Sequence, residues 1–408
     1  MKALRARSTE EVRPLGATRL TRDRFTWLAY LLLGYFAYLQ AVLGPVMPFL
    51  RDDLHINHTV GSLHVSAFAL GAIVSGLVGD RLAYRYGRRR IFWSGAAGMA
   101  LGAVCLALAR TAALTIPAAL LMGTFGALLL ILIQSTLADR HGARRAIALT
   151  ESNVVASICA GLAPVLVGGF QGSGLGWRGA LFAAVVVFVL LGFYGRTIAL
   201  PARAAAPALA RETGVADNSR SERALPPIFW AYWVLMLFCV AIEWCVVVWS
   251  ADFLHDASGL SAVTAASALS VFFVAEVIGR VIGSRLTHSR STISLLLLAL
   301  VVTLAGFPLL WLAPVAPLRV VGLLITGLGV ANLFPLTLAT ATGVSASNAD
   351  SASSRVTLAG GIAVFTAPLL MGKVADTIGI QRAYGIIAVL VVLALAMAGL
   401  ASRLHRAK

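Results

Sequence analysis

Long apolar stretches separated by short polar segments repeat along the whole chain. A helix needs roughly 20 mostly apolar residues to cross the hydrocarbon core of a bilayer, and twelve of the stretches are close to that length. They lie at residues 25–46, 59–78, 91–109, 114–138, 147–170, 179–195, 228–253, 262–283, 292–312, 318–342, 353–372 and 381–402. The pattern therefore predicts an all-α, polytopic membrane protein.

Composition agrees with this prediction. The chain is 59% hydrophobic and only 12% charged, a balance that would leave a soluble domain without a polar surface. The first 24 residues are basic and polar and lack the short apolar core of a signal peptide, so we expect the first helix to remain in the mature protein. The four cysteines lie inside apolar stretches and are interpreted as packing residues.

The net charge of +16 is interpreted from the positions of the Lys and Arg residues relative to the predicted spans. Of the 33 Lys and Arg residues, six fall at the predicted outer side, namely Arg51, Arg110, Arg178, Arg319, Lys373 and Arg382. Nearly all the others fall in the inner segments, which the positive-inside rule assigns to the cytoplasm. We therefore expect a cell inner membrane protein with both termini in the cytoplasm, lipids as its surroundings and no nucleic-acid partner.

The chain divides into two similar halves. Residues 196–227 form the longest polar stretch between helices and are the predicted linker. Residues 163–168 (APVLVG) match 367–372 (APLLMG), and Gly79-Asp80-Arg81-Leu82 matches Gly283-Ser284-Arg285-Leu286, both with an offset of 204. We predict a duplicated six-helix unit: a tail at 1–24, bundles at 25–195 and 228–402 around the linker, and a tail at 403–408.

The segment 79–90 (GDRLAYRYGRRR) resembles the signature loop between helices 2 and 3 of the major facilitator superfamily. The resemblance implies a transporter of two pseudo-symmetric six-helix bundles, expected to be monomeric. It also implies gating roles for Asp80, Arg81 and Arg88. One position departs from the family pattern, because Tyr84 stands where an acidic residue is usual, and Asp80 lies one helical turn earlier on the same face.

Looser patterns resemble the fucose permease type of sugar:proton symporter. These are Glu243-Trp244, Phe272-Phe273 with Gly279-Arg280, and Gly327-Leu328-Gly329 before Phe334-Pro335. The resemblance implies proton-coupled symport of a small organic solute, with a sugar or another polar compound favoured. Two alternatives remain open: a multidrug or metabolite:proton antiporter, suggested by residues 161–169, and a membrane sensor that transports nothing.

Few ionisable groups fall within the predicted spans. A charge at membrane depth is costly, so each is a functional candidate. Glu243 lies near the middle of the seventh helix, where burial favours the neutral carboxyl and suits a proton carrier. Glu276 and Arg280 are spaced to pair on one face of the eighth helix. We assign proton coupling to Glu243, Glu276 and Glu151.

The same charges predict gates. Glu151 and Arg355 are separated by 204 residues and open the fifth and eleventh helices. In the architecture that the resemblance implies, the second helix meets the eleventh and the fifth meets the eighth. We therefore expect pairs from Asp80 to Arg355 and from Glu151 to Arg280 when the cytoplasmic side is closed.

Polar and aromatic side chains near the midplane are the candidates for substrate contact. A helix break at residues 332–335 is expected because Pro335 removes a backbone donor. The candidates are Tyr35, Tyr38, Gln40, Gln134, Asn153, Trp244 and Asn332. No nucleotide-binding motif, metal-ligand spacing or nucleophile arrangement stands out, so we expect no cofactor, no metal and no enzymatic activity, and the expected partners are a small molecule and protons.

Overall fold

The computed structural model describes residues 21–201, 225–287, 289–345 and 348–406. Twelve helical segments within this part of the chain are long and apolar enough to cross a membrane, as the sequence predicts. The elements are α1 (Arg24–Ala41), α2 (Leu43–Leu54), α3 (His58–Tyr86), α4 (Arg88–Leu108), α5 (Ala112–His141), η1 (Gly142–Arg144), α6 (Arg145–Gly172), α7 (Arg178–Gly195), α9 (Pro227–Ser258), α10 (Ala262–Leu286), α11 (Thr292–Leu312), α12 (Ala316–Val330), α13 (Leu333–Gly343), α14 (Ala349–Ile378), α15 (Ile380–Ala383) and α16 (Ile386–Arg406).

Polar side chains mark where several helices begin. Asp23, Asn57, Ser261 and Ser291 each accept a hydrogen bond from a backbone N–H in the first turn of α1, α3, α10 and α11. These bonds satisfy donors that have no partner within the helix. The starts of these four helices are thus determined by residues at the helix ends themselves.

Two of the twelve spans are interrupted. The first continues beyond the predicted end at residue 46, because α2 follows α1 after Val42 and runs on to Leu54. The tenth is divided into α12 and α13 at Ala331 and Asn332, where the sequence predicts a break. Pro335 has no N–H to offer to the carbonyl four residues back, which leaves the Ala331 carbonyl free for another donor.

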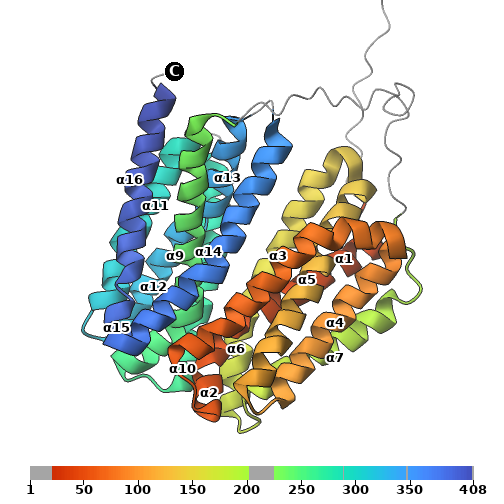
Figure 1. Cartoon of the computed structure of the whole chain (residues 1–408), viewed down its shortest axis with the longest axis horizontal. Coiled ribbons are helices and arrows are strands. Elements are labelled where there is room, and N and C mark those ends of the chain that lie inside the picture. Colours follow the sequence, from red (N-terminus) through yellow and green to blue (C-terminus); the bar gives the residue numbers. More distant parts are fainter. Residues whose placement is uncertain (1–20, 202–224, 288, 346–347, 407–408) are drawn as a thin grey trace, which may run out of the picture.

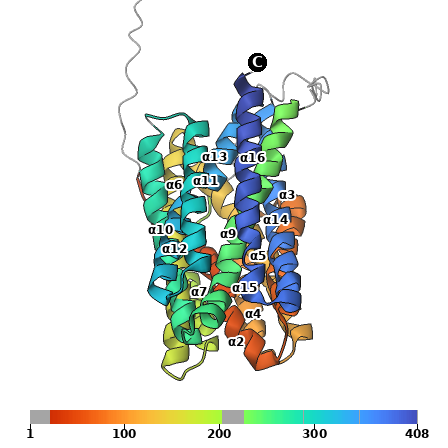
Figure 2. The same ribbon diagram turned by 90° about the vertical axis from the view of Figure 1, so that its left-hand side faces the viewer.

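The helices form two bundles, one before and one after the predicted linker. Figure 1 shows them apart at the end of the molecule where the carboxyl terminus lies, and together at the other end. We call these ends the terminus side and the opposite side. Figure 2 shows α10, α11 and α12 along one flank of the second bundle. Most of the predicted linker and the first tail lie outside the described residues.

The duplicated sequence motif lies at equivalent places between the bundles. α3 packs against α14, and α6 packs against α10. Gly168 on α6 lies against Val263 and Ser267 of α10, while Gly372 on α14 lies against His58 and Ser62 of α3. Each glycine lets two helices from different bundles approach closely, which explains why the motif occurs once in each half.

Candidate functional site at the interface of the two bundles

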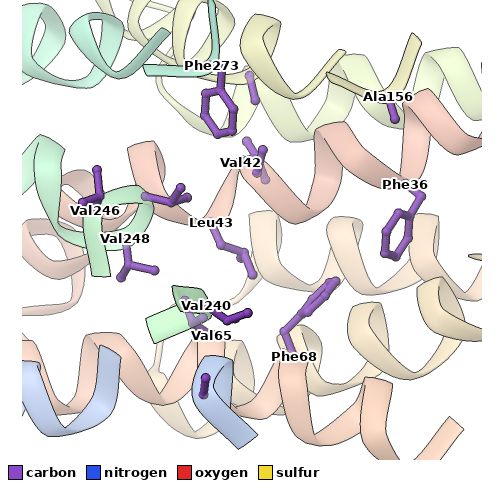
Figure 3. Close-up of a cluster of buried hydrophobic side chains, with 14 of the residues drawn as sticks. Phe36, Val42, Leu43, Val65, Phe68, Ala156, Val240, Val246, Val248 and Phe273 are labelled. Atoms are coloured by element: carbon purple, nitrogen blue, oxygen red, sulfur yellow. The ribbon is translucent and has the colours of Figure 1, made fainter. Parts of the chain in front are cut away.

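On the opposite side, the bundles share a continuous apolar core. Figure 3 shows Val42 and Leu43 of the first bundle close to Val240, Val246 and Val248 of α9, and all five side chains are buried. At Gly44 a side chain is excluded, because a Cβ atom would lie within 2.3 Å of the Val247 carbonyl oxygen. Close packing of this kind leaves no path for a solute at this level.

Two polar contacts join the bundles beyond this core. Arg51 of α2 forms an ion pair with Asp252 of α9, whose side chain is 4% exposed. Asp376 of α14 accepts hydrogen bonds from the backbone N–H groups of His58 and Thr59, and also from the Thr59 hydroxyl. The His58 ring contacts the same carboxylate at 3.0 Å. We call these four residues and Thr59 the latch.

Contacts between α3 and α14 stop partway toward the terminus side. The Ser66 hydroxyl donates to the Phe365 carbonyl at 2.7 Å, and Ile73 lies against Gly361. Nearer the terminus side, Gly76 has open space around its Cα, and Leu77 is 73% exposed. The molecule is therefore closed at the opposite side and open at the terminus side.

A cluster of charges lies at the middle of the spans. Glu243 lies halfway along α9 and within electrostatic range of Glu276 and Arg280 on α10. The Arg280 guanidinium donates to the Glu276 carboxylate at 3.3 Å and to the Ser157 hydroxyl of α6 at 2.6 Å. The bond to Ser157 joins the two bundles, because α6 belongs to the first bundle and α10 to the second.

Arg280 also reaches the break in the tenth span. Its Nε atom lies 3.5 Å from the Ala331 carbonyl oxygen, which Pro335 leaves without an intrahelical donor. The Arg280 side chain is 43% exposed. The guanidinium faces water between the bundles and not lipid, because it bonds to Ser157 of α6 across the interface and a charge facing hydrocarbon costs several kcal/mol. The cluster therefore borders an aqueous space between the bundles.

Glu151, also predicted to couple protons, lies apart from this cluster. Its carboxylate accepts hydrogen bonds from Arg22 at 2.6 Å and from the Tyr30 hydroxyl at 3.0 Å. The predicted pair of Glu151 with Arg280 belongs to a closed terminus side and is not formed in this open arrangement. The Arg22 partner was not foreseen, because residues before a helix carry no pattern that places them against another helix.

The remaining gating candidates lie near the terminus side. Arg355 lies with its guanidinium carbon 5.9 Å from the Trp230 ring centre, and its carbonyl accepts a hydrogen bond from Trp233. Arg88 pairs with Asp139 inside the first bundle, and Arg81 is exposed. The side chain of Asp80 lies outside the described part of the structure.

The substrate candidates are divided among several positions. The Tyr35 and Tyr38 hydroxyls donate to backbone carbonyls of Ala96 and Ala180 inside the first bundle, so neither is free for a solute. Asn332 donates to the Gly279 carbonyl and Asn153 to the Leu149 carbonyl. The others have no polar contact among the described residues: Gln134 is exposed, and Gln40 and Trp244 are half-buried.

Sequence reasoning missed the latch and Ser157. The latch residues lie near helix ends, where polar and charged side chains are ordinary, and only the paired bundles bring them together. Within the described residues, no three His, Cys, Asp or Glu side chains are grouped so as to hold a metal ion.

Twelve spans in two bundles, closed at one side and lined with charge at their midplane, define a polytopic membrane transporter. The comparisons with known proteins specify the family. Residues 26–344 match the model of the Major Facilitator Superfamily, and the chain belongs to this family. It is a transporter and not an enzyme.

Two relatives and one solved structure are similar to this chain. An uncharacterized MFS-type transporter of Yersinia pestis is 24% identical over 399 residues, which cover 93% of this chain and 95% of that protein. The multidrug efflux pump LfrA of Mycolicibacterium smegmatis is 32% identical over 176 residues, covering 40% of this chain and 33% of the pump. The crystal structure of a D-xylose-proton symporter has a TM-score of 0.73 at 14% identity, covering 92% of this chain and 96% of that one.

Proposed function

We propose that this transporter moves a small polar organic solute across the cell inner membrane by alternating access, coupled to protons. The observation that carries the proposal is the position of Glu243, halfway along α9 and within electrostatic range of Glu276 and Arg280. Two carboxyl groups beside one arginine hold a single ion pair and leave a second carboxyl to take or release a proton.

The contacts of Arg280 connect this proton to movement of the bundles. When Glu276 is ionised, it holds the Arg280 guanidinium, which also donates to Ser157 across the interface. The proton is shared between Glu243 and Glu276, and when it resides on Glu276 it weakens that hold and frees the guanidinium. Protonation thereby changes the relative free energies of the open and closed arrangements, which is what coupling requires.

We assign the terminus side to the cytoplasm, because most Lys and Arg residues fall in segments at that side. The structure then corresponds to an inward-facing state. Gln134, Gln40 and Trp244 supply amide groups and one aromatic face, which suit a sugar-like or similarly polar solute. Of the proposed substrate residues, these three form no hydrogen bond to another described residue.

A second candidate function is efflux of drugs or metabolites by proton antiport. The observation that favours it is the 32% identity to the multidrug efflux pump LfrA over 176 residues. The same carboxyl cluster would serve, because antiport and symport differ in whether proton and solute bind together or in turn.

The test begins with purified protein and a thermal-shift screen of sugars, sugar acids, nucleosides, amino acids and lipophilic cations. A hit is then followed into liposomes under an imposed proton gradient. We expect accumulation against a solute gradient that an uncoupler abolishes and that Glu243→Gln lacks. Asp53→Asn, which alters an ion pair with Arg178 inside the first bundle, serves as the control. Accumulation that persists with the uncoupler would rule out proton coupling.

A further inference from the structure

A hollow lies on the flank of the second bundle, between α10 and α11 and over the break in the tenth span. It has a volume of about 210 Å³ and an almost entirely apolar surface. Its walls include Gly283 and Leu286 of α10, Leu298 and Val302 of α11, and Leu336 of α13. This hollow is separate from the charged cluster, although Gly279 in its wall immediately precedes Arg280.

The hollow opens into the bilayer. Ile282 and Leu298 line it and are 48% and 49% exposed, and both lie within membrane spans. Water is a poor occupant, because a buried water needs two to four polar partners and the Asn332 amide N–H already donates to the Gly279 carbonyl. A hydrocarbon chain from the surrounding lipid fits the surface better.

Two arginines lie beside the hollow at the terminus side. Arg285 directly precedes Leu286, and Arg290 follows it in the turn that leads to α11, where its N–H donates to the Leu286 carbonyl. Both side chains are exposed, and neither has a charged partner among the described residues. Arginine binds phosphate through paired N–H donors, and basic groups at the cytoplasmic ends of helices attract anionic lipid head groups.

We propose that the hollow between α10 and α11 is a binding site for an anionic phospholipid. One acyl chain occupies the apolar hollow, and the phosphate binds Arg285 and Arg290. The bound chain packs against the α12–α13 break and against the helix that carries Glu276 and Arg280. The lipid therefore supports the elements that hold the charged cluster in place.

The test is native mass spectrometry of the whole protein in a neutral detergent, with added phosphatidylglycerol or phosphatidylcholine. We expect retained phosphatidylglycerol and little phosphatidylcholine. The Arg285→Gln/Arg290→Gln variant should bind phosphatidylglycerol on the order of 30-fold more weakly, at about 1 kcal/mol for each arginine near the head group. The control variant Arg90→Gln/Arg403→Gln also removes two positive charges from the terminus side, but away from the hollow. It should bind phosphatidylglycerol as the unchanged protein does.

A second pair of variants tests the acyl chain. Val302→Phe fills the hollow and should reduce binding, whereas Val301→Phe adds the same bulk at an exposed neighbouring position and should not. Glycerol phosphate, which offers the phosphate alone, should not compete. Equal retention of both lipids, equal binding by the two arginine variants or equal binding by the two phenylalanine variants would each overturn the proposal.

Discussion

The Asp376 carboxylate on α14 lies over the amino-terminal end of α3 and accepts a hydrogen bond from the Thr59 N–H at 2.9 Å. A helix start carries unpaired N–H groups and a partial positive charge, which a carboxylate satisfies. Here the capping group comes from the other bundle. The Asn57 cap within the first bundle remains when the two bundles separate at this side, but the cap from Asp376 is lost.

Removal of Asp252 should also weaken the contact between the bundles at this side, because Asp252 pairs with Arg51 of the other bundle. Asp252→Asn removes the negative partner and leaves the largely buried Arg51 guanidinium without its counter-charge. Breaking a buried ion pair in this way destabilises the contact by roughly 3–5 kcal/mol. We expect the population to shift by more than about 100-fold toward an arrangement open at the opposite side. Transport should slow, because the closed arrangement is one stage of the cycle.

Accessibility measures this shift. Val65 is buried between the bundles, so Val65→Cys, in a background without the four native cysteines, should react with an impermeant maleimide only when the opposite side opens. Asp53→Asn is the matched control, since Asp53 pairs with Arg178 in its own bundle. Equal labelling of the two variants would contradict the role of the latch.

Gly44 predicts a steric route to the same state. A Cβ atom there would lie 2.3 Å from the Val247 carbonyl oxygen, whereas one at Gly192 of α7 would meet nothing within 4 Å. Gly44→Ala should therefore force the bundles apart, increase labelling at Val65→Cys and reduce transport. Gly192→Ala, on a helix that packs against α1, α4 and α6 of the first bundle, should leave both unchanged. Normal labelling in Gly44→Ala would mean that α2 shifts to accommodate the methyl group.

The gates at the terminus side predict rescue by double charge reversal. A single charge reversal at any of the four residues should lower transport, namely at Asp80, Arg355, Glu151 or Arg280. The doubles Asp80→Arg/Arg355→Asp and Glu151→Arg/Arg280→Glu should recover part of it, because opposite charges face one another again. Failure of both doubles to exceed their singles would count against these gates.

Arg22 offers an independent test, since it holds Glu151 in the open arrangement. Arg22→Gln should free Glu151 for Arg280 and favour closure of the terminus side. Spin labels at Tyr84→Cys on α3 and Thr357→Cys on α14, measured by electron paramagnetic resonance, should then move closer. An unchanged distance would show that Arg22 does not compete for Glu151.

Asp23 predicts a dependence of stability on pH. Burial raises the pKa of its carboxyl, but the hydrogen bonds from Thr26 and the ion pair with Arg140 outweigh burial and place the pKa below the ordinary 3.8. A lowered folded pKa contributes stability above pH 3.8 that disappears as pH falls through the folded value.

The variant Asp23→Asn keeps the helix cap and loses the ion pair. We expect it to lower the thermal unfolding midpoint by about 1 °C at pH 7 and by less as the pH approaches 3. Asp53→Asn on the opposite side offers a comparison at each pH. A decrease for Asp23→Asn that does not diminish on acidification would assign the effect to the cap instead.

The sequence by itself determined the twelve spans, because the length of an apolar stretch is set by the thickness of the bilayer and is written in consecutive residues. It also placed the break before Pro335, since a missing N–H is a local property. Glu243 stood out for the same reason, as a single carboxyl far inside an apolar stretch.

Only the tertiary structure decided which distant side chains meet. Tyr35 and Tyr38 look like substrate contacts in the sequence, yet the rotation of α1 in its bundle turns their hydroxyls to backbone carbonyls. The partners Arg51 and Asp252 are 201 residues apart, and Arg280 reaches Ser157 across the interface. Such pairs depend on how two bundles rest against each other, and a helix's own sequence records which residues are apolar but not which neighbour each face meets.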